Sequence, residues 1–443
     1  MGFRPAPGIR GREIQMTIVS RQGWRIVAGA VALTAMMAPA LAQDVTTIRV
    51  LNWQPGGPDY WAQLVAAFEK ANPDVKVELE TVPFDRYPSV QGPYIATKSG
   101  PDVMENNAGL ELFDRRSAYV QLPEDVLAAA GDLITYSGGC LNYDTTQPCY
   151  GLPFGYQGNV MYYNKAVLTE AGLDAANPPK TWDEMDAACT AVKAIGKTCL
   201  AHGMTGVFPA YWNFPEVARN FLTEDDMRAI MVGKLPWTDP KMVSILEAMA
   251  SIGTTRGWIN SSSPSISMLP DGADIFQSGN AAFASTIIAD AVNWAAFGAA
   301  LGDENVGAMS WPVLVADAPL AHSFSGTESS VFGVTPWSTK QEAGFKFVKF
   351  VAGVENANLL ASVAGGISLN RNVDPNALPK SQALAQIQEI IKKPTLHVGV
   401  LLSGQEADAL ARGWQEVTLG TITVADWTAQ MQTALEESPS KAQ

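Results

Sequence analysis

Apolar and polar positions follow two different periods in the first part of the chain. Residues 48–53 form a short apolar run typical of a strand, and residues 75–80 alternate apolar with charged positions, as a half-buried strand does. Between them, residues 59–71 repeat apolar side chains every three or four positions. This spacing predicts an amphipathic helix, which Asn72 and Pro73 end.

The same order continues for one more unit. Residues 87–98 are helix-like, Gly100 and Pro101 form a turn signal, and residues 102–105 read as a third strand. Strands that alternate with helices in this way predict a parallel sheet with helices on both of its faces. We therefore expect an α/β fold.

The remainder of the chain keeps the α/β pattern. Thr181 and Glu184 have the spacing of a capping box, which predicts the start of a helix. Residues 281–288 form an apolar run typical of a buried strand, and residues 345–354 and 425–437 read as helices. No repeat and no single low-complexity linker divides the chain, so we expect two lobes between which the chain passes more than once.

Residues 137–165 mark the first predicted passage between lobes. The segment starts polar and glycine-rich, is then interrupted by Gly151, Pro153, Gly155 and Gly158, and ends as a β-branched and aromatic strand. We expect the chain to leave one lobe here and enter the other, with a ligand against the break.

Residues 1–42 are predicted to be a cleaved secretory signal peptide. Arg21 and Arg25 precede the uncharged apolar residues 26–38, and small residues close the segment before Gln43. The apolar stretch is too short to span a membrane, and a buried N-terminal helix is the alternative interpretation.

The export signal is expected to yield a soluble periplasmic protein. No cysteine lies near the expected cleavage position and no arginine pair precedes it, which favours neither a lipoprotein nor twin-arginine export. Met16 is an alternative start to Met1. The formal net charge of −14 argues against nucleic acid and anionic lipid as partners.

The four cysteines fall into two local pairs, Cys140 with Cys149 and Cys189 with Cys199. An exported protein folds in an oxidising compartment, so two disulfides are expected, and short loops favour pairing of neighbours among the three possible pairings. A zinc site is the alternative, but the cysteines lack Cys-x-x-Cys spacing and the chain holds only three histidines.

A series of short motifs resembles one family in the order of its parts. The chain is similar to the family 1 extracellular solute-binding proteins of ABC importers. The matching stretches are residues 48–53, 68–73 (FEKANP), 101–103 (PDV), 150–165 (ending in YYNK), 179–184 (PKTWDE), 278–283 (SGNAAF), 307–312 (GAMSWP) and 342–350 (EAGFKFVKF).

This resemblance implies a two-lobed periplasmic-binding-protein fold. Each lobe would hold a mostly parallel sheet flanked by helices, and three crossovers would join the lobes. The N-terminal lobe is expected to comprise residues 43–152 and 313–352, and the C-terminal lobe residues 153–312 and 353–443.

The resemblance also implies a function. A monomeric receptor would capture a sugar, an oligosaccharide or a polyol by lobe closure and deliver it to the membrane permease of an ABC transporter, without a cofactor. A glycerol-phosphate ester is the alternative ligand. A secreted carbohydrate-active enzyme and a surface adhesin are the alternative classes; an adhesin would show repeats or β-sandwich strands, which are not evident.

Strand ends supply the first candidate ligand-binding residues. Ligands of open α/β sheets bind beyond the carboxyl ends of the strands. This rule selects Asn52 and Trp53 after the first strand and Glu105, Asn106 and Asn107 after the third. Adjacent asparagines also favour tight turns, which is the structural alternative for that pair. Flat aromatic rings suit the C–H faces of sugars, and the chain contains 12 Trp and 11 Tyr.

The resemblance adds candidates from the rest of the chain. Family members place ligand-facing residues in the first crossover, in an aromatic loop, beyond the apolar strand and in a small polar loop, although Ala289 stands where a stacking tryptophan is expected. Arg371 is a further candidate, with a surface role as the alternative. The remaining matching positions are Tyr156, Gln157, Tyr211, Trp212, Asp290, Trp294, Ser325, Gly326 and Thr327.

An enzyme would need a pair of carboxylates beside the scissile bond. Glu105 and Asp290 could form such a pair, but nothing in their spacing requires it. The chain contains no G-x-S-x-G, G-x-x-x-x-G-K-[ST] or H-E-x-x-H motif. We therefore expect neither catalytic residues nor a metal site.

Overall fold

The computed structural model describes residues 45–53, 57–83, 86–287, 293–393, 395–397, 402–438 and 441. The expected signal peptide, residues 1–42, and the candidate Asp290 lie outside these residues. Within the described residues no single helix has both the length and the apolar composition to cross a membrane, although one bent pair of helices does by these two criteria alone.

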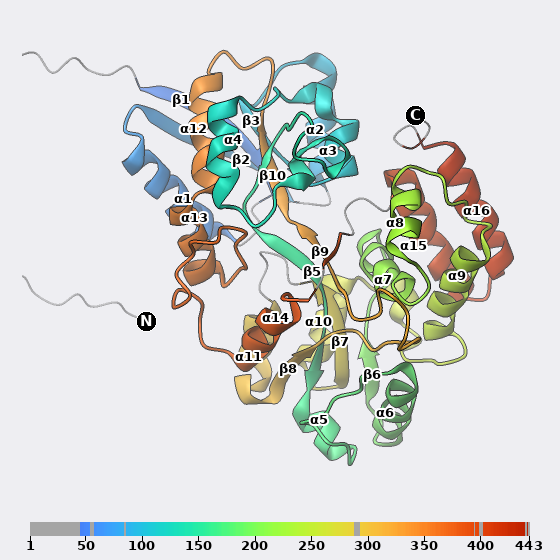
Figure 1. Cartoon of the computed structure of the whole chain (residues 1–443). Coiled ribbons are helices and arrows are strands. Elements are labelled where there is room, and N and C mark those ends of the chain that lie inside the picture. The colour runs from blue at the N-terminus through green and yellow to red at the C-terminus, as the bar shows by residue number, and fades with distance from the viewer. Residues whose placement is uncertain are drawn as a thin grey trace, which may run out of the picture. The chain divides into compact units, whose positions relative to one another are not determined.

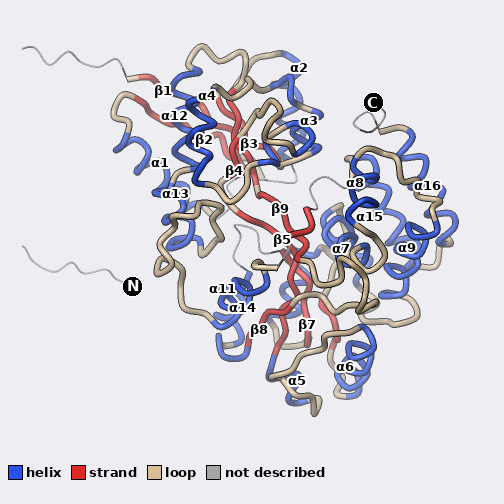
Figure 2. Tube along the Cα trace, viewed as in Figure 1, coloured by secondary structure: helices blue, strands red, loops and turns tan. Residues whose placement is uncertain are grey.

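The first sheet has the strand order β2-β1-β3-β10-β4 (Figures 1 and 2). β1 lies parallel to both β2 and β3, so the predicted strand-helix-strand-helix-strand unit is confirmed. α1 buries Tyr60, Trp61, Leu64 and Phe68, which confirms the amphipathic helix that the apolar spacing predicts. The elements of this unit are β1 (Thr46–Asn52), α1 (Pro58–Ala71), β2 (Val75–Thr81), α2 (Tyr87–Thr97), β3 (Val103–Asn107), β4 (Leu152–Pro153) and β10 (Ser330–Val334).

The second sheet has the order β11-β9-β5-β7-β6, and β8 also pairs with β5. Its central strand β5 is antiparallel to β7, β8 and β9, while β6 with β7 and β11 with β9 are parallel. The strands are β5 (Tyr156–Asn164), β6 (Thr198–Ala201), β7 (Ala281–Ile287), β8 (Val306–Met309), β9 (Phe324–Glu328) and β11 (Thr395–His397).

The expectation of mostly parallel sheets is therefore wrong for the second sheet and incomplete for the first. The physical reason lies in the passages between the sheets. β3 ends where β10 begins, because Asn107 is paired with Ser330, and the two strands consequently run in opposite directions. β5 and β9 run antiparallel for the same reason, since one enters the second sheet from the first and the other leaves it.

Helices cover both sheets (Figure 1). The capping box of Thr181 and Glu184 is confirmed at the start of α6 (Trp182–Ala194), and both predicted C-terminal helices are present as α12 and α16. Together with α12 and α16, the α-helices after α2 other than α6 have these bounds: α3 (Leu110–Asp114), α4 (Glu124–Ala129), α5 (Lys165–Glu170), α7 (Phe208–Ala218), α8 (Glu224–Met231), α9 (Pro240–Gly253), α10 (Ala273–Gln277), α11 (Asn293–Leu301), α12 (Gln341–Ala352), α13 (Val354–Leu359), α14 (Gln382–Ile390), α15 (Gly404–Thr418) and α16 (Val424–Glu436).

One aromatic stretch predicted as a loop is helical. Tyr211 and Trp212 lie on α7. Pro209 stands in the first turn of this helix, where a missing N–H is tolerated, and Pro215 stands inside it. The loop that the resemblance implies is therefore wrong for this stretch, which tolerates one proline in the first turn and one inside the helix.

Three segments lie side by side where the chain passes between the sheets: residues 154–155, Ser329, and residues 367–368, which precede the third passage. Residues 154–155 join β4 to β5, and Ser329 alone joins β9 to β10. Ser329 N–H donates to the carbonyl of Gly155 at 2.8 Å, and Tyr156 N–H donates to the carbonyl of Ile367 at 2.8 Å. We call these three segments the crossing, the half with the first sheet the first lobe, and the half with the second sheet the second lobe.

The positions of β9, β10 and α13 favour lobe boundaries other than the expected ones at residues 313 and 353. β9 lies in the second sheet and β10 in the first, and α13 contacts α1 and α12 of the first lobe. On these contacts we propose that the second passage falls at Ser329 and the third after Asn370.

Both expected disulfides are present, and neighbours are paired. Cys140 is bonded to Cys149, and Cys189 of α6 is bonded to Cys199 of β6. The first bridge closes the loop that precedes the crossing. All four sulfurs are thereby used, and no group of three metal-ligating side chains occurs among the described residues.

Candidate functional site

The candidates of the first lobe lie at the end of β1 and on β3. The expectation that the third strand ends at residue 105 is wrong, because Asn106 and Asn107 are paired with β10 and continue the strand. Asn52 is fully buried, and its Oδ1 accepts from Thr81 Oγ1 at 2.9 Å. The backbone N–H of half-buried Trp53 donates to Oε2 of fully buried Glu105 at 2.9 Å. The Trp53 ring meets Tyr87 edge-on at 4.8 Å. The structure therefore places Asn52, Trp53 and Glu105 close together, as the strand-end rule predicts.

The two asparagines after Glu105 are bonded within the first lobe. Asn106 Oδ1 accepts from Gln91 Nε2 at 3.2 Å and from Arg115 Nη1 at 3.4 Å. Asn107 Nδ2 donates to Glu111 Oε2 at 2.6 Å, and Glu111 also pairs with Arg115. These bonds join the end of β3 to α3, so the two asparagines stabilise the packing of α3 against this strand.

The candidates of the crossing lie on the β5–β9 ladder. Tyr156 is buried, with its ring 5.8 Å from Phe324, and Gln157 Nε2 donates to the carbonyl of Glu328 at 3.4 Å. The expectation of a small polar loop is wrong for Ser325, Gly326 and Thr327, which are buried on strand β9 and pair with β5. A Cβ at Gly326 would lie 2.4 Å from the Phe324 ring of the same strand and 3.0 Å from the carbonyl of Gln157 on β5, so the packing here favours glycine.

The candidates of the second lobe lie on α7 above a buried polar network. Asn159 Nδ2 of β5 donates to the carbonyl of Trp212 at 2.9 Å. The network continues through Ser285, Asn213 and His202, with Trp311 Nε1 donating to Ser285 Oγ at 3.2 Å. Trp212 is buried, and the half-buried Tyr211 ring meets it edge-on at 5.6 Å.

Several buried polar atoms near these candidates have no hydrogen-bond partner in the described part of the chain. Among them are Asn52 Nδ2, Trp212 Nε1 and the hydroxyl of Tyr143. A buried polar group without a partner destabilises a protein by about 1–3 kcal/mol, so such groups are retained chiefly where something else satisfies them. These atoms come from both lobes.

Tyr143 and Tyr211 connect the two lobes. Tyr143 packs against buried clusters of both, and its ring lies 5.4 Å from Phe113 of α3. Burial raises the pKa of Tyr143, and the nearby Tyr211 and Glu328 raise it further. Burial likewise raises the pKa of Tyr211, with an added contribution from the negative charge of Glu111. The first-lobe helix α3 therefore lies near the second-lobe helix α7.

Two candidates have structural contacts elsewhere. Arg371 is exposed, and its Nη2 donates to the carbonyl of Leu133 at 3.0 Å, which favours the surface role. Trp294 is half-buried, and its Nε1 donates to the carbonyl of Gly365 at 3.4 Å, next to the crossing. Ligand contact by either residue stays a prediction.

Sequence reasoning missed Tyr143 and Glu328. Tyr143 lies in the polar segment that was expected to precede the passage, but no pattern distinguishes it there. Glu328 directly follows the Ser-Gly-Thr stretch selected as a polar loop, and it is fully buried. A carboxylate beside that stretch was the available signal.

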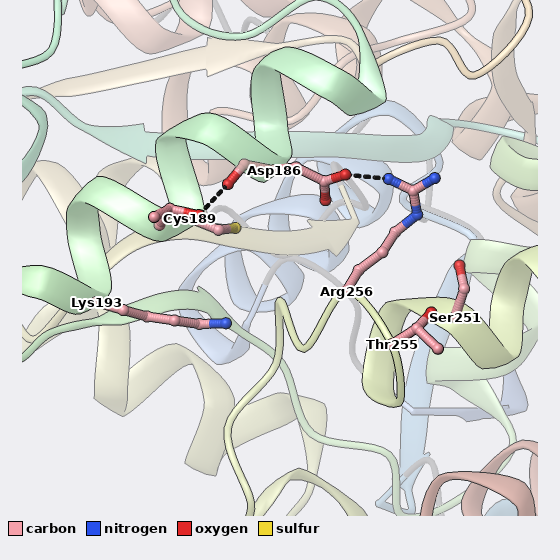
Figure 3. Close-up of a pocket in the computed structure, with 7 residues that line it drawn as sticks. Asp186, Cys189, Lys193, Ser251, Thr255 and Arg256 are labelled. Atoms are coloured by element: carbon pink, nitrogen blue, oxygen red, sulfur yellow. Dashed lines mark hydrogen bonds and ion pairs between the residues drawn. The ribbon is translucent and has the colours of Figure 1, made fainter.

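An open surface pocket is lined by none of these candidates. It has a volume of about 380 Å³, lies between α6 and α9, and is lined by Asp186, Lys193 and Arg256 among others (Figure 3). Asp186 pairs with Arg256 and accepts from Trp258 Nε1 at 2.6 Å, and Arg256 lies 4.9 Å above the Trp182 ring. These contacts hold α6 against the segment that follows α9, so the residues that line the pocket have a structural role.

Residues 63–388 match the family model of the bacterial extracellular solute-binding proteins. The chain belongs to this family. A Brucella abortus protein whose name says only that it is a binding protein is 28% identical to this solute-binding protein over 193 residues, 40% of this chain and 44% of that protein.

A second relative carries a more specific name. The sn-glycerol-3-phosphate-binding periplasmic protein of Brucella suis is 26% identical over 254 residues, 51% of this chain and 56% of that protein. The matched region of this solute-binding protein thus spans about half the length of these curated relatives.

Solved structures of the same fold include a chitin oligosaccharide binding protein. It superposes with a TM-score of 0.76 at 18% identity and covers 89% of this chain and 99% of its own. At this identity the likeness concerns the fold. The two-lobed architecture expected from the sequence is thereby confirmed.

Proposed function

We propose that this chain captures a sugar, an oligosaccharide or a polyol between its two lobes and delivers it to the membrane permease of an ABC importer. The observation that carries the proposal is the meeting of both lobes around Tyr143 and Tyr211, with unpartnered buried polar atoms on either side. A bound solute would satisfy those atoms.

The side chains at this meeting suit a polyhydroxylated ligand. Trp53 and Tyr211 are half-buried aromatic residues from opposite lobes. Aromatic faces bury the C–H faces of a sugar ring, and amides and carboxylates bind its hydroxyls. The name of the chitin oligosaccharide binding protein supports this ligand class.

Lobe closure would couple capture to delivery. A ligand that touches both lobes binds the closed form better, and it therefore shifts the population toward that form. The permease would recognise the closed form. We further propose that the receptor acts as a periplasmic monomer after removal of its signal peptide, without a cofactor, a nucleic acid partner or catalytic turnover.

A glycerol-phosphate ester is the second candidate ligand, because the Brucella suis relative is named for one. The charges near the candidates favour a neutral ligand instead. Glu105 and Glu328 are fully buried, and the guanidinium of Arg115, which reaches Asn106, is already paired with Glu111. A phosphate would have to enter beside these carboxylates, which disfavours its charged form.

Removing an aromatic face from either lobe should weaken binding. We expect Trp53→Ala and Tyr211→Ala each to raise the dissociation constant for a bound sugar by about tenfold or more, because each removes a large apolar contact. Titration calorimetry with the sugar that binds the wild type measures the change.

Tyr94→Ala is the matched control, because Tyr94 donates to Glu80 of the edge strand β2, away from the candidates. Unchanged affinity in both Trp53 and Tyr211 variants would remove these residues from the binding surface. Loss of affinity in one variant alone would place the ligand on one lobe.

A further inference from the structure

Glu328 lies next to the one-residue connection of the crossing. It is the last residue of β9, and a single residue, Ser329, separates it from β10 in the other sheet. Its partner on the ladder is Tyr156, the first residue of β5. Its side chain is fully buried. A carboxylate therefore stands where two of the three passages lie together.

The donors to this carboxylate come mainly from one short segment. Oε1 accepts from Thr135 Oγ1 at 2.7 Å, from Ser137 Oγ at 3.0 Å and from the backbone N–H of Gly138 at 3.0 Å. Oε2 accepts from Thr327 Oγ1 at 3.2 Å. Hydrogen bonds of this number compensate the desolvation of a buried carboxylate, and hydrogen bonds to an ionised group are stronger than those between neutral groups.

The segment has no room to move away from Glu328 without disturbing the first lobe. Gly138 accepts from Gly109 N–H at 2.8 Å, directly before α3. A Cβ at Gly138 would lie 2.8 Å from the Ala108 side chain and 3.1 Å from Glu328 Oε2. Gly138 thus lies between the end of β3 and the carboxylate, and it links the two.

The same segment leads to Tyr143. The chain runs from Gly138 through Cys140, whose disulfide to Cys149 closes a short loop, to Tyr143 in that loop. Tyr143 packs against buried clusters of both lobes. The position of Tyr143 therefore depends on how residues 135–138 are held.

We propose that Glu328 is a positioning residue that fixes residues 135–138, and with them Tyr143, to the crossing, and that ligand capture depends on this carboxylate although it does not touch the ligand. The dependence of capture rests on the proposed function, whereas the fixing of the segment does not. Because the segment is bonded both to Glu328 of β9 and to Gly109 of the first lobe, it holds Tyr143 at the junction of the two lobes.

Hydrogen–deuterium exchange of the full chain without ligand tests the first half of the proposal. Glu328→Gln exchanges one acceptor oxygen for a donor amide and removes the charge. We expect amide exchange in residues 137–143 to become about tenfold faster, with peptides from α9 and α16 unchanged, because only the local opening energy falls. Glu247→Gln on the exposed face of α9 is the matched control and should leave residues 137–143 at the wild-type rate.

Titration calorimetry of the same variants tests the second half. The probes are N,N′-diacetylchitobiose, maltose, galactose and sorbitol, and the one that binds the wild type should bind Glu328→Gln more weakly by about threefold or more. Wild-type protection of residues 137–143 in Glu328→Gln would overturn the proposal, and so would a uniform rise in exchange over the whole chain. Faster local exchange with unchanged affinity would overturn the dependence of capture.

Failure of the wild type to bind any probe would count against the proposed function, while the exchange result would still decide whether Glu328 fixes the segment. Should Glu328→Gln not fold, Thr135→Val combined with Ser137→Ala removes two donors and keeps the carboxylate. This double variant should show the same local increase in exchange. Wild-type protection in it would equally overturn the proposal.

Discussion

Replacing Arg219 with methionine should lower the free energy of unfolding by about 3–5 kcal/mol, because it breaks a buried ion pair by removing one partner. Arg219 is fully buried at the end of α7 and pairs with the carboxylate of buried Glu216 at 3.2 Å. Its guanidinium also donates to the carbonyls of Trp311 at 2.6 Å and Ser323 at 2.5 Å. The variant would leave these acceptors without their charged donor.

The position of Arg219 explains why the effect should be large. Its two carbonyl acceptors belong to the stretch after β8 and to the stretch before β9, so one side chain holds both against α7. Burial raises the pKa of Glu216, and the charge of Arg219 counteracts that rise. Once the guanidinium is gone, the carboxylate must either remain charged without a partner or take up a proton.

Urea unfolding of matched variants measures this prediction. Arg228→Met on α8 is the control, because Arg228 is exposed and its pairs with Glu224 and Asp225 should be worth less than about 1 kcal/mol. The double variant Arg219→Met with Glu216→Gln should recover part of the loss, since it removes the buried charge. A loss below about 1 kcal/mol for Arg219→Met would contradict the account of this pair.

Acidification should destabilise the protein through His202 by about 3 kcal/mol between pH 6.5 and pH 4. His202 is buried, its ring Nε2 lies 3.2 Å from Asn213 Nδ2, and its ring packs near Trp414. Burial lowers its pKa from 6.5 to about 4. In this pH range the unfolded chain binds a proton that the folded chain does not bind, so stability is present above pH 6.5 and is lost as the pH falls.

The comparison with His202→Gln isolates this contribution from the titration of the carboxylates. Glutamine can keep a hydrogen bond to Asn213 but does not titrate, so the variant should lose less stability on acidification than the wild type, by about 3 kcal/mol at pH 4. Urea unfolding at pH 7 and pH 4 measures the difference. His322→Gln at an exposed position is the matched control and should keep the wild-type loss. Equal losses in wild type and His202→Gln would rule out a neutral buried imidazole.

Local signals were sufficient for several individual elements of both lobes. The apolar stripe of α1, the alternation in β2 and the capping box of α6 are each encoded within a few residues. Strand direction in the second sheet is different, because it depends on which distant strands become neighbours of β5. Apolar runs in β5 and β7 look the same in parallel and antiparallel pairs.

The candidate-site residues likewise differ in whether local sequence is enough to select them. Asn52, Trp53 and Glu105 could be selected from strand ends, and hydrogen bonding brings Trp53 and Glu105 together. Tyr143 and Glu328 were not selected, because their contacts arise from segments that are distant in the chain and adjacent only at the crossing. Tyr211 was selected for its aromatic surroundings, although those surroundings form a helix rather than a loop.

We expect this solute-binding protein to capture a neutral polyhydroxylated ligand. Titration calorimetry of the wild-type protein with N,N′-diacetylchitobiose, maltose, galactose, sorbitol and glycerol 3-phosphate distinguishes this ligand class from a phosphate ester. Saturable binding of at least one neutral compound, together with weaker or no binding of glycerol 3-phosphate, is the expected result. Saturable binding of glycerol 3-phosphate alone would rule out a neutral ligand.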